Sequence, residues 1–501
     1  MSVISYLFLI FYVILLPSKM IKIKFIQFFL NLNDLEKKDF RKFVSSGYFN
    51  RGRDFSAFLL VFEKNREKAS NARDLIKLIS EDLSYTRRSV WNRFHELTSL
   101  ADQFIAIKEI NRNELLFSNL VSSYHINKFE YGLFNQKVNQ SRKKFGKTKR
   151  GLDTNYYYYQ LLQQLGNSYI FQNKTEPFIT NLTEQVIYHS ASYIINHYLN
   201  LIELLQQGNL TAKDLSEKGL NFLTDNNTEN FINTLKEKHY DLYCQVSIHY
   251  NIYKAFLLKN DESYYKTSLK FFELVSGTAD NAYKSLFYQL FINYCIERTN
   301  KNEPEYYKEL FRLYNKKLSE GLFQDLQVGN FPINNFRDYI FVALQLGEIE
   351  WIKWFISKYS HHLPQNVRED EINLSYGIVY YHESDHSAAL KFLNKVAGYN
   401  YIHYMDSKYY KLRLYYETQS YEEAILEIDN YKHYLRSHKE IPDTFAKPYK
   451  VFIKEYFVLL NSELKNKPED AAILAEQIKA KAITPRRRWI LNKLNELIKN
   501  K

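Results

Sequence analysis

The chain has 501 residues and carries 68 lysines and arginines against 56 aspartates and glutamates, a formal net charge of +12. With only 14 glycines and 9 prolines, it lacks the turn residues that an all-β fold or glycine-rich nucleotide-binding loops require, so the composition favours long helices with short connections. The positive charge permits attraction to nucleic acid or anionic lipid but, spread over the whole chain, establishes neither.

The first apolar segment, residues 3–16, matches no targeting signal well. As a helix it would span about 21 Å, less than the roughly 30 Å of a bilayer core, and it lacks the basic start and small-residue cleavage site of a signal peptide. We interpret residues 1–19 as an apolar leader outside the true protein, which would then begin at Met20 rather than Met1. The alternative is an inner-membrane anchor that keeps the body in the cytoplasm, because lysines follow the apolar segment.

Cysteine usage also favours the cytoplasm. The chain has two cysteines, Cys244 and Cys295, both within aromatic helical segments. Their spacing fits neither a disulfide framework nor a metal site, so buried thiols in a reducing compartment are expected.

Residues 20–150 are predicted to form an N-terminal helical region. Apolar residues recur there at intervals of three and four, as in amphipathic helices. Asn33 is predicted to cap a second helix within 21–44. After a loop at 45–53, further helices are predicted at 54–64, 72–83 and 86–107.

Residues 151–332 are predicted to form degenerate helical hairpins. Long helices are expected at 156–172, 178–207, 231–259 and 306–321, and one of the breaks between helices is placed at 225–228. No break is long enough for a disordered linker, so one continuous array is expected.

A 35-residue repeat near the C-terminus is the strongest pattern in the chain. Aromatic, small and aliphatic residues return at that interval, which is typical of stacked helical hairpins. The first set is Tyr380, Ala389, Leu393 and Val396, and the second is Tyr415, Ala424, Ile428 and Tyr431.

Over residues 333–437 this pattern resembles the tetratricopeptide repeat. Gly377 and Ala389 occupy positions where that repeat has small residues, which let two helix backbones approach closely. The early loop SGYFNRGR also resembles a segment of uncharacterised bacterial helical-repeat proteins. These resemblances imply an all-α fold, a right-handed superhelical array of antiparallel helical hairpins (an α-solenoid), closed by capping helices at 438–501.

The resemblance also implies a concave groove lined by the first helix of each hairpin. Aromatic side chains with scattered arginines would suit an apolar or acidic partner. The alternative is that the same residues only pack against neighbouring helices. The predicted groove positions are Arg337, Phe341, Ile378, Tyr381, His382, Tyr409, Arg413 and Tyr416.

One catalytic pattern is present. The run His382-Glu383-Ser384-Asp385-His386 satisfies H-E-x-x-H, in which two histidines one helical turn apart bind zinc and the glutamate activates water. That chemistry requires a continuous helix, whereas the repeat register predicts a turn between the two histidines. We therefore predict no metal site.

Two basic clusters are candidate anion or nucleic-acid patches. Both are more commonly solvated helix ends, and cations at the start of a helix oppose its dipole unless they hold an anion. The first comprises Arg142, Lys143, Lys144, Lys147, Lys149 and Arg150, and the second Arg486, Arg487 and Arg488.

We expect from these patterns a non-catalytic scaffold that binds another protein or a peptide through its groove, without a cofactor. The alternative is a nucleic-acid-associated repeat protein that uses the basic patches, and a remote one is a zinc-dependent hydrolase. Phosphate-binding glycine loops and nucleophile elbows are absent from the sequence, so an enzyme is not expected. Membrane contact is expected only if residues 1–19 are an anchor.

Overall fold

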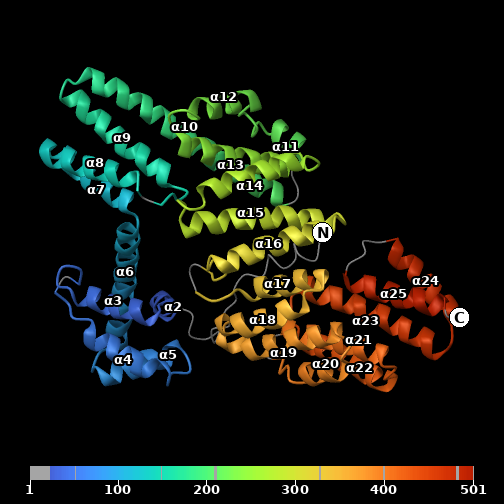
Figure 1. Ribbon diagram of the computed structural model, residues 1–501. Helices are drawn as coiled ribbons and strands as arrows, with labels where there is room; N and C mark the ends of the chain where they lie inside the picture. Colours follow the sequence, from blue (N-terminus) through green and yellow to red (C-terminus); the bar gives the residue numbers. More distant parts are fainter. Residues whose placement is uncertain are drawn as a thin grey trace. The chain divides into compact units, whose positions relative to one another are not determined.

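The computed structural model describes residues 23–50, 52–147, 149–207, 211–325, 329–398, 401–480 and 485–499. These residues form helices joined by short connections (Figure 1), and the only strand-like pairing among them is an isolated bridge between Arg150 and Ala279. The all-α prediction is therefore confirmed. The predicted leader and Met20 lie outside the described residues. Among the described helices, none has the length and apolar character needed to cross a membrane.

The chain divides into two compact units. The N-terminal unit comprises the described residues of Phe11–Tyr253 and Glu273–Ala279, and the C-terminal unit those of Lys254–Phe272 and Asp280–Lys501. Each unit has its own buried apolar clusters, so each is described by itself.

The N-terminal unit is built from helices α2 to α12, together with most of α13 and the end of α14. The helices are α2 (Lys24–Asn31), α3 (Asp34–Ser45), α4 (Ser56–Arg66), α5 (Ala72–Asp82), α6 (Arg87–Arg112), α7 (Glu114–Asn127), α8 (Tyr131–Phe145), α9 (Thr154–Phe171), α10 (Thr175–Gln206), α11 (Ala212–Glu217), α12 (Asp225–Leu235), α13 (Tyr240–Leu257) and α14 (Glu262–Val275).

Aromatic packing holds the first helices together. The Phe25 ring on α2 lies 5.9 Å from Phe40 on α3, 5.6 Å from Phe62 on α4 and 6.0 Å from Phe94 on α6, measured between ring centroids. Each fully buried phenylalanine stabilises the fold by about 1.5–3 kcal/mol. Asn33 caps α3 through a reciprocal capping box with Glu36, which confirms the predicted restart of the helix there.

Two predictions in this unit are wrong. The helix predicted at 231–259 is divided, because α12 ends at Leu235 and α13 begins only at Tyr240. The break predicted at 225–228 is the first turn of α12. The Thr224 hydroxyl accepts a hydrogen bond from the Asn227 backbone N–H at 3.3 Å, and such a cap allows a polar Asn-rich segment to start a helix.

The C-terminal unit contains the rest of α13 and α14 and the helices from α15 to α25. These helices are α15 (Asn281–Asn300), α16 (Tyr306–Ser319), α17 (Ile333–Leu346), α18 (Ile349–Tyr359), the 3₁₀ turn η1 (Ser360–His362), α19 (Gln365–His382), α20 (His386–Leu393), α21 (Tyr401–Glu417), α22 (Tyr421–Ser437), α23 (Asp443–Leu464), α24 (Pro468–Lys479) and α25 (Pro485–Lys499).

Successive helices of this unit pack against one another. Helix α19 contacts α20, α21 contacts α22 and α24 contacts α25, while the first helices α17, α19, α21 and α23 also contact each other in order. At Gly377 on α19 an added Cβ would lie 2.7 Å from the Leu393 side chain. The predicted close approach between α19 and α20 is therefore confirmed, and it requires glycine at this position.

The 35-residue repeat corresponds to a repeated burial pattern. Ala389 and Leu393 on α20 are fully buried, and so are Ala424 and Ile428 at the matching places on α22. The repeat thus marks the side of each second helix that packs against its first helix.

Candidate functional site

A set of linked polar side chains crosses α17, α19, α21, α23 and α25. We call it the polar ladder. Its members lie on five helices that do not follow one another directly in the chain. The ladder therefore joins segments distant in sequence. The members are Arg337, Glu371, His403, Asp406, Tyr449 and Arg486.

One end of the polar ladder is a buried ion pair. The Arg337 Nε donates to both carboxylate oxygens of Glu371 at 2.9 Å, and its Nη2 donates to Oε2 at 2.6 Å. The His403 Nε2 lies 2.7 Å from the same Oε2, and Glu371 is only 1% exposed. Burial alone would raise the pKa of Glu371, but Arg337 and His403 outweigh it and lower the pKa to about 2.

The other end of the polar ladder is centred on Asp406. Its carboxylate accepts a hydrogen bond from Arg337 Nη1 at 3.2 Å and from the Tyr449 hydroxyl at 2.5 Å. Arg486 Nη2 lies 3.4 Å from Asp406 Oδ1 and donates to the Tyr449 hydroxyl oxygen at 2.7 Å. Two arginines thus face two carboxylates within the ladder.

Beside the polar ladder, the Arg413 guanidinium is surrounded by aromatic rings. Its Cζ lies 4.5 Å from the ring centroid of Tyr381, 5.2 Å from Trp489 and 5.5 Å from both Tyr409 and Tyr410. We call these five residues the arginine cage. Stacking of this kind is favourable, more so when the cation is shielded from water.

A single carboxylate fixes two walls of the arginine cage. Glu417 on α21 accepts a hydrogen bond from the Tyr381 hydroxyl and another from Trp489 Nε1, the latter at 2.8 Å. Arg413 has no carboxylate within ion-pair distance among the described residues, and its buried Nε has no hydrogen-bond partner. Its Nη1 donates a hydrogen bond to the Tyr409 hydroxyl at 3.2 Å.

The structure brings half of the predicted groove positions together in the arginine cage and beside it. Tyr381, Tyr409 and Arg413 are cage members, and Tyr416 packs edge-on against Trp489 with ring centroids 5.8 Å apart. The Tyr416 hydroxyl also donates to Glu463.

The remaining groove positions have separate surroundings. Arg337 belongs to the polar ladder, and the Phe341 ring lies 6.3 Å from that of Tyr307. Ile378 packs against the small apolar cluster around Leu374. His382 is exposed and contacts the Tyr381 ring edge-on at 5.5 Å. Much of this predicted set therefore also packs within the chain.

Sequence reasoning missed Glu371, Asp406, Glu417 and Trp489. A signal for the first two is present, since Glu371 and Asp406 lie 35 residues apart, which is one repeat length. Carboxylates that recur at one register position indicate pairing with a cation on a neighbouring repeat. No comparable signal marks Trp489, because α25 lies outside the repeated segment.

The H-E-x-x-H pattern is divided by a turn, as the repeat register predicts. His382 is the last residue of α19 and His386 the first of α20, and Ser384 between them has a φ of +61°. The two imidazoles are therefore not one turn apart on a continuous helix. Within the described ranges, no group of three potential ligands is arranged to hold a metal ion.

The first basic cluster is partly engaged by acidic residues. Arg142 pairs with Glu184 at 3.4 Å and Lys144 pairs with Glu114. Arg150 pairs with Asp241 at 3.3 Å. Three lysines of the cluster, Lys143, Lys147 and Lys149, are exposed.

The second basic cluster is mainly internal. Arg486 belongs to the polar ladder, and Arg487 donates from Nε and Nη2 to Glu455 Oε1 at 3.0 and 2.8 Å. Arg488 is exposed. Its first two members thus contribute to holding α25 against the rest of the unit.

Comparison of the chain with protein-family models, with curated proteins and with solved structures found no match. The polar ladder, the arginine cage and the exposed lysines are the features from which a function can be argued.

Proposed function

We propose that the chain is a non-catalytic helical-repeat scaffold and that its C-terminal unit binds a segment of another protein. In this proposal α17 to α22 form a right-handed superhelical array of hairpins like those of tetratricopeptide-repeat proteins. The first helices then line a groove that receives the partner. The burial pattern of the 35-residue repeat and the close approach at Gly377 support this arrangement.

The arginine cage is the observation that carries the binding proposal. Arg413 is largely removed from water, and its guanidinium contacts aromatic faces and one hydroxyl; the Glu417 carboxylate acts on its charge without bonding to it. A desolvated cation without an anionic partner is unfavourable, and a charge-assisted hydrogen bond to a carboxylate is stronger than a neutral one. A partner carboxylate would thus gain more here than at a solvated arginine.

The chemistry of the surrounding residues narrows the class of partner. Tyr416, which is half-buried, adds aromatic surface beside the buried Trp489 wall of the cage, and aromatic residues with arginine are the most frequent hot spots of protein interfaces. A peptide that alternates acidic and apolar side chains would use both features. The proposed partner is therefore an acidic-apolar segment rather than a basic one.

Peptide binding tests this proposal directly. Fluorescence anisotropy would compare dye-labelled acidic-apolar peptides with basic-apolar peptides of equal length, using the full chain and its Arg413→Gln variant. We expect the wild type to favour the acidic set and the variant to bind it about tenfold more weakly, the loss of one charge-assisted hydrogen bond. Arg436→Gln, at an exposed position on α22, is the matched control and should bind as the wild type does.

Folding is checked by the thermal unfolding midpoint of each variant, and Arg413→Lys retains the charge without the planar guanidinium. Equal binding of acidic and basic peptides would refute the proposal. So would equal losses in Arg413→Gln and Arg436→Gln.

The alternative of a nucleic-acid-associated protein rests on Lys143, Lys147 and Lys149, which remain exposed on the N-terminal unit. Binding through such residues weakens steeply between low and physiological salt, because phosphate neutralisation releases counterions. Retention on immobilised RNA at low salt, lost when the three lysines are replaced by glutamine, would favour this alternative. Absence of retention at low salt would exclude it.

A further inference from the structure

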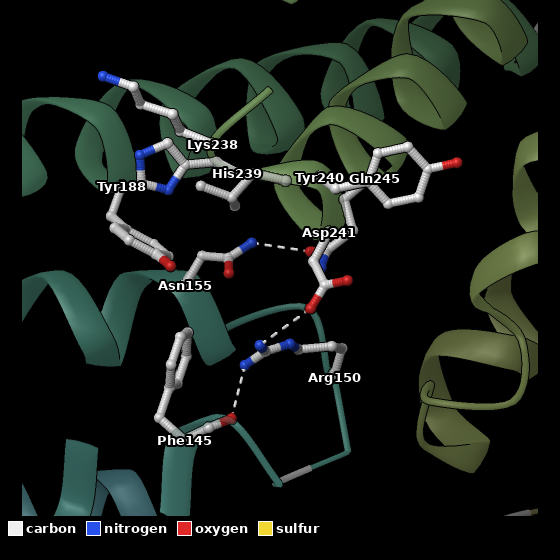
Figure 2. Close-up of a pocket in the computed structure, with 10 residues that line it drawn as sticks. Phe145, Arg150, Asn155, Tyr188, Lys238, His239, Tyr240, Asp241 and Gln245 are labelled. Carbon is white, nitrogen blue, oxygen red and sulfur yellow. Dashed lines mark hydrogen bonds and ion pairs between the residues drawn. The ribbon is translucent and has the colours of Figure 1, made fainter. Parts of the chain in front are cut away.

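The N-terminal unit contains a cavity of about 210 Å³ beside Arg150. Figure 2 shows its walls, which come from the end of α8, the start of α9, the middle of α10 and the turn that leads into α13. Phe145 and Tyr188 form an aromatic side with ring centroids 5.7 Å apart. Three segments distant in sequence, residues 145–155, Tyr188 and residues 238–245, therefore meet around one polar space.

Arg150 is held rigidly at this cavity. Its Nη1 donates to the Phe145 carbonyl oxygen at 2.9 Å, and its guanidinium lies 4.0 Å from the centroid of the Phe145 ring. Its backbone N–H donates to the Thr278 carbonyl oxygen at 2.8 Å. The side chain is 11% exposed, so the guanidinium is positioned before any ligand arrives, which lowers the entropic cost of binding.

The balance of charge around the cavity is positive. Asp241 is the only carboxylate in its lining; it pairs with Arg150, and its side chain is 64% exposed. Lys238 and His239 also line the cavity, and Lys238 has no ion pair with a described residue. One carboxylate thus faces two permanent cations and an imidazole, a balance that attracts an anion.

The deep part of the cavity presents a buried pair of amides. The Asn155 Nδ2 donates to Gln245 Oε1 at 2.8 Å, and these residues are 1% and 2% exposed. No other side-chain hydrogen bond of either residue occurs among the described residues. One carbonyl and one NH₂ group therefore remain, and this holds for either orientation of the two amides. Buried polar groups of this kind are costly unless a ligand or water pairs with them.

The volume sets the size of a ligand. Sites for drug-sized molecules measure about 300–1,000 Å³, and one water takes about 30 Å³ of liquid volume, so the cavity has room for roughly seven waters. A dinucleotide or a peptide would extend well beyond this volume. A compact metabolite with one acidic group fits.

From these features we propose that the cavity beside Arg150 binds a small polar metabolite that carries an oxyanion. Arg150 contacts the oxyanion, the Asn155 and Gln245 amides contact a hydrogen-bonding group at the other end of the ligand, and Lys238 adds positive charge at the exposed rim. A carboxylate and a phosphate share this chemistry. Burial raises the pKa of Tyr188, so its hydroxyl stays protonated and can donate to either group. This site is independent of the peptide-binding proposal for the C-terminal unit.

Calorimetric titration of the full chain with three probes tests the site. N-acetylglycine carries a carboxylate and an amide, N-acetylglycinamide is its neutral analogue, and inorganic phosphate is the second oxyanion. We expect saturable binding of N-acetylglycine or of phosphate, and none of N-acetylglycinamide. The probe that binds more tightly identifies the oxyanion.

Two variants and a control locate the binding. Lys238→Gln, at the exposed rim, should weaken binding about threefold, as expected for one exposed charge. Arg150→Gln should weaken it at least tenfold, and its unfolding midpoint shows whether the fold persists. Lys236→Gln, at an exposed residue outside the lining, should change nothing. No saturable binding of either oxyanion, tight binding of the neutral analogue, or equal effects of Lys238→Gln and Lys236→Gln would overturn the proposal.

Discussion

Replacement of Glu371 by glutamine should destabilise the C-terminal unit by about 3 kcal/mol at neutral pH. The folded-state pKa of this carboxylate is about 2, against an ordinary value of 4.5, and each pKa unit corresponds to about 1.4 kcal/mol. Removal of one partner of a buried ion pair typically costs about 3–5 kcal/mol of stability, and the loss expected for Glu371→Gln lies at the lower end of this range. Glutamine keeps the size of the side chain but leaves the Arg337 charge without its closest anion.

The pH dependence of this loss follows from the sign of the shift. Because the folded-state pKa lies below the unfolded value, the contribution of Glu371 is complete above about pH 4.5 and declines as the pH falls towards 2. With these two values, the difference in unfolding free energy between wild type and Glu371→Gln should shrink by about 2 kcal/mol from pH 7 to pH 3. Other carboxylates titrate in both proteins, so their effect cancels in the difference.

Urea unfolding followed by tryptophan fluorescence is a suitable assay. Three of the four tryptophans, Trp351, Trp354 and Trp489, belong to the same unit as Glu371. Glu369→Gln, at an exposed position on the same helix, is the matched control and should change stability by less than about 0.5 kcal/mol. A Glu371→Gln loss that stayed constant from pH 7 to pH 3, or that matched the Glu369→Gln loss, would refute the reasoning about the polar ladder.

Two further substitutions test the packing of the C-terminal unit. Gly377→Ala should lower the free energy of unfolding by about 1–3 kcal/mol, because the added Cβ would overlap the Leu393 side chain. Gly132→Ala, on a helix with open space around it, is the control and should raise the free energy of unfolding by up to about 1 kcal/mol. Chemical denaturation measures both changes, and equal effects would contradict the close approach at Gly377. Arg487→Gln should lower the free energy of unfolding by about 1–3 kcal/mol, because its hydrogen bonds to Glu455 are lost, and it should leave retention on heparin unchanged. Unchanged stability with weaker retention on heparin would instead place Arg487 in an anion site.

Local patterns in the sequence predicted most of the helices. Asn33 marks the start of α3 because its side chain and Glu36 exchange hydrogen bonds with the backbone within one turn. The wrong prediction of a break at 225–228 also concerns a helix cap. The polar composition of residues 225–228 favours a loop, but the Thr224 cap stabilises the start of a helix there. The division between α12 and α13 was missed because no glycine or proline marks it; residues 236–239 are three charged residues and a histidine, which also occur on exposed faces of continuous helices.

The candidate sites depend on contacts that no local pattern encodes. Tyr381 and Arg413 could be named from the repeat register, because equivalent positions of stacked hairpins face the same way. Trp489 reaches Glu417 across 72 residues of sequence, and nothing in the segment around it indicates that partner. The cavity beside Arg150 likewise needs three separate segments. The sequence therefore pointed to only one of its cations, Arg150, as part of a basic run.

The polar ladder also bears on how the C-terminal unit would yield to a pulling force. In a simple repeat array each hairpin touches only its neighbours and can detach singly. Here Arg337 on α17 bonds to Asp406 on α21, two hairpins along, and Arg486 on α25 bonds to the same carboxylate from the other side. Tension applied at the ends would load both ion pairs together, so the segment from α17 to α25 would give way as one mechanical element rather than hairpin by hairpin.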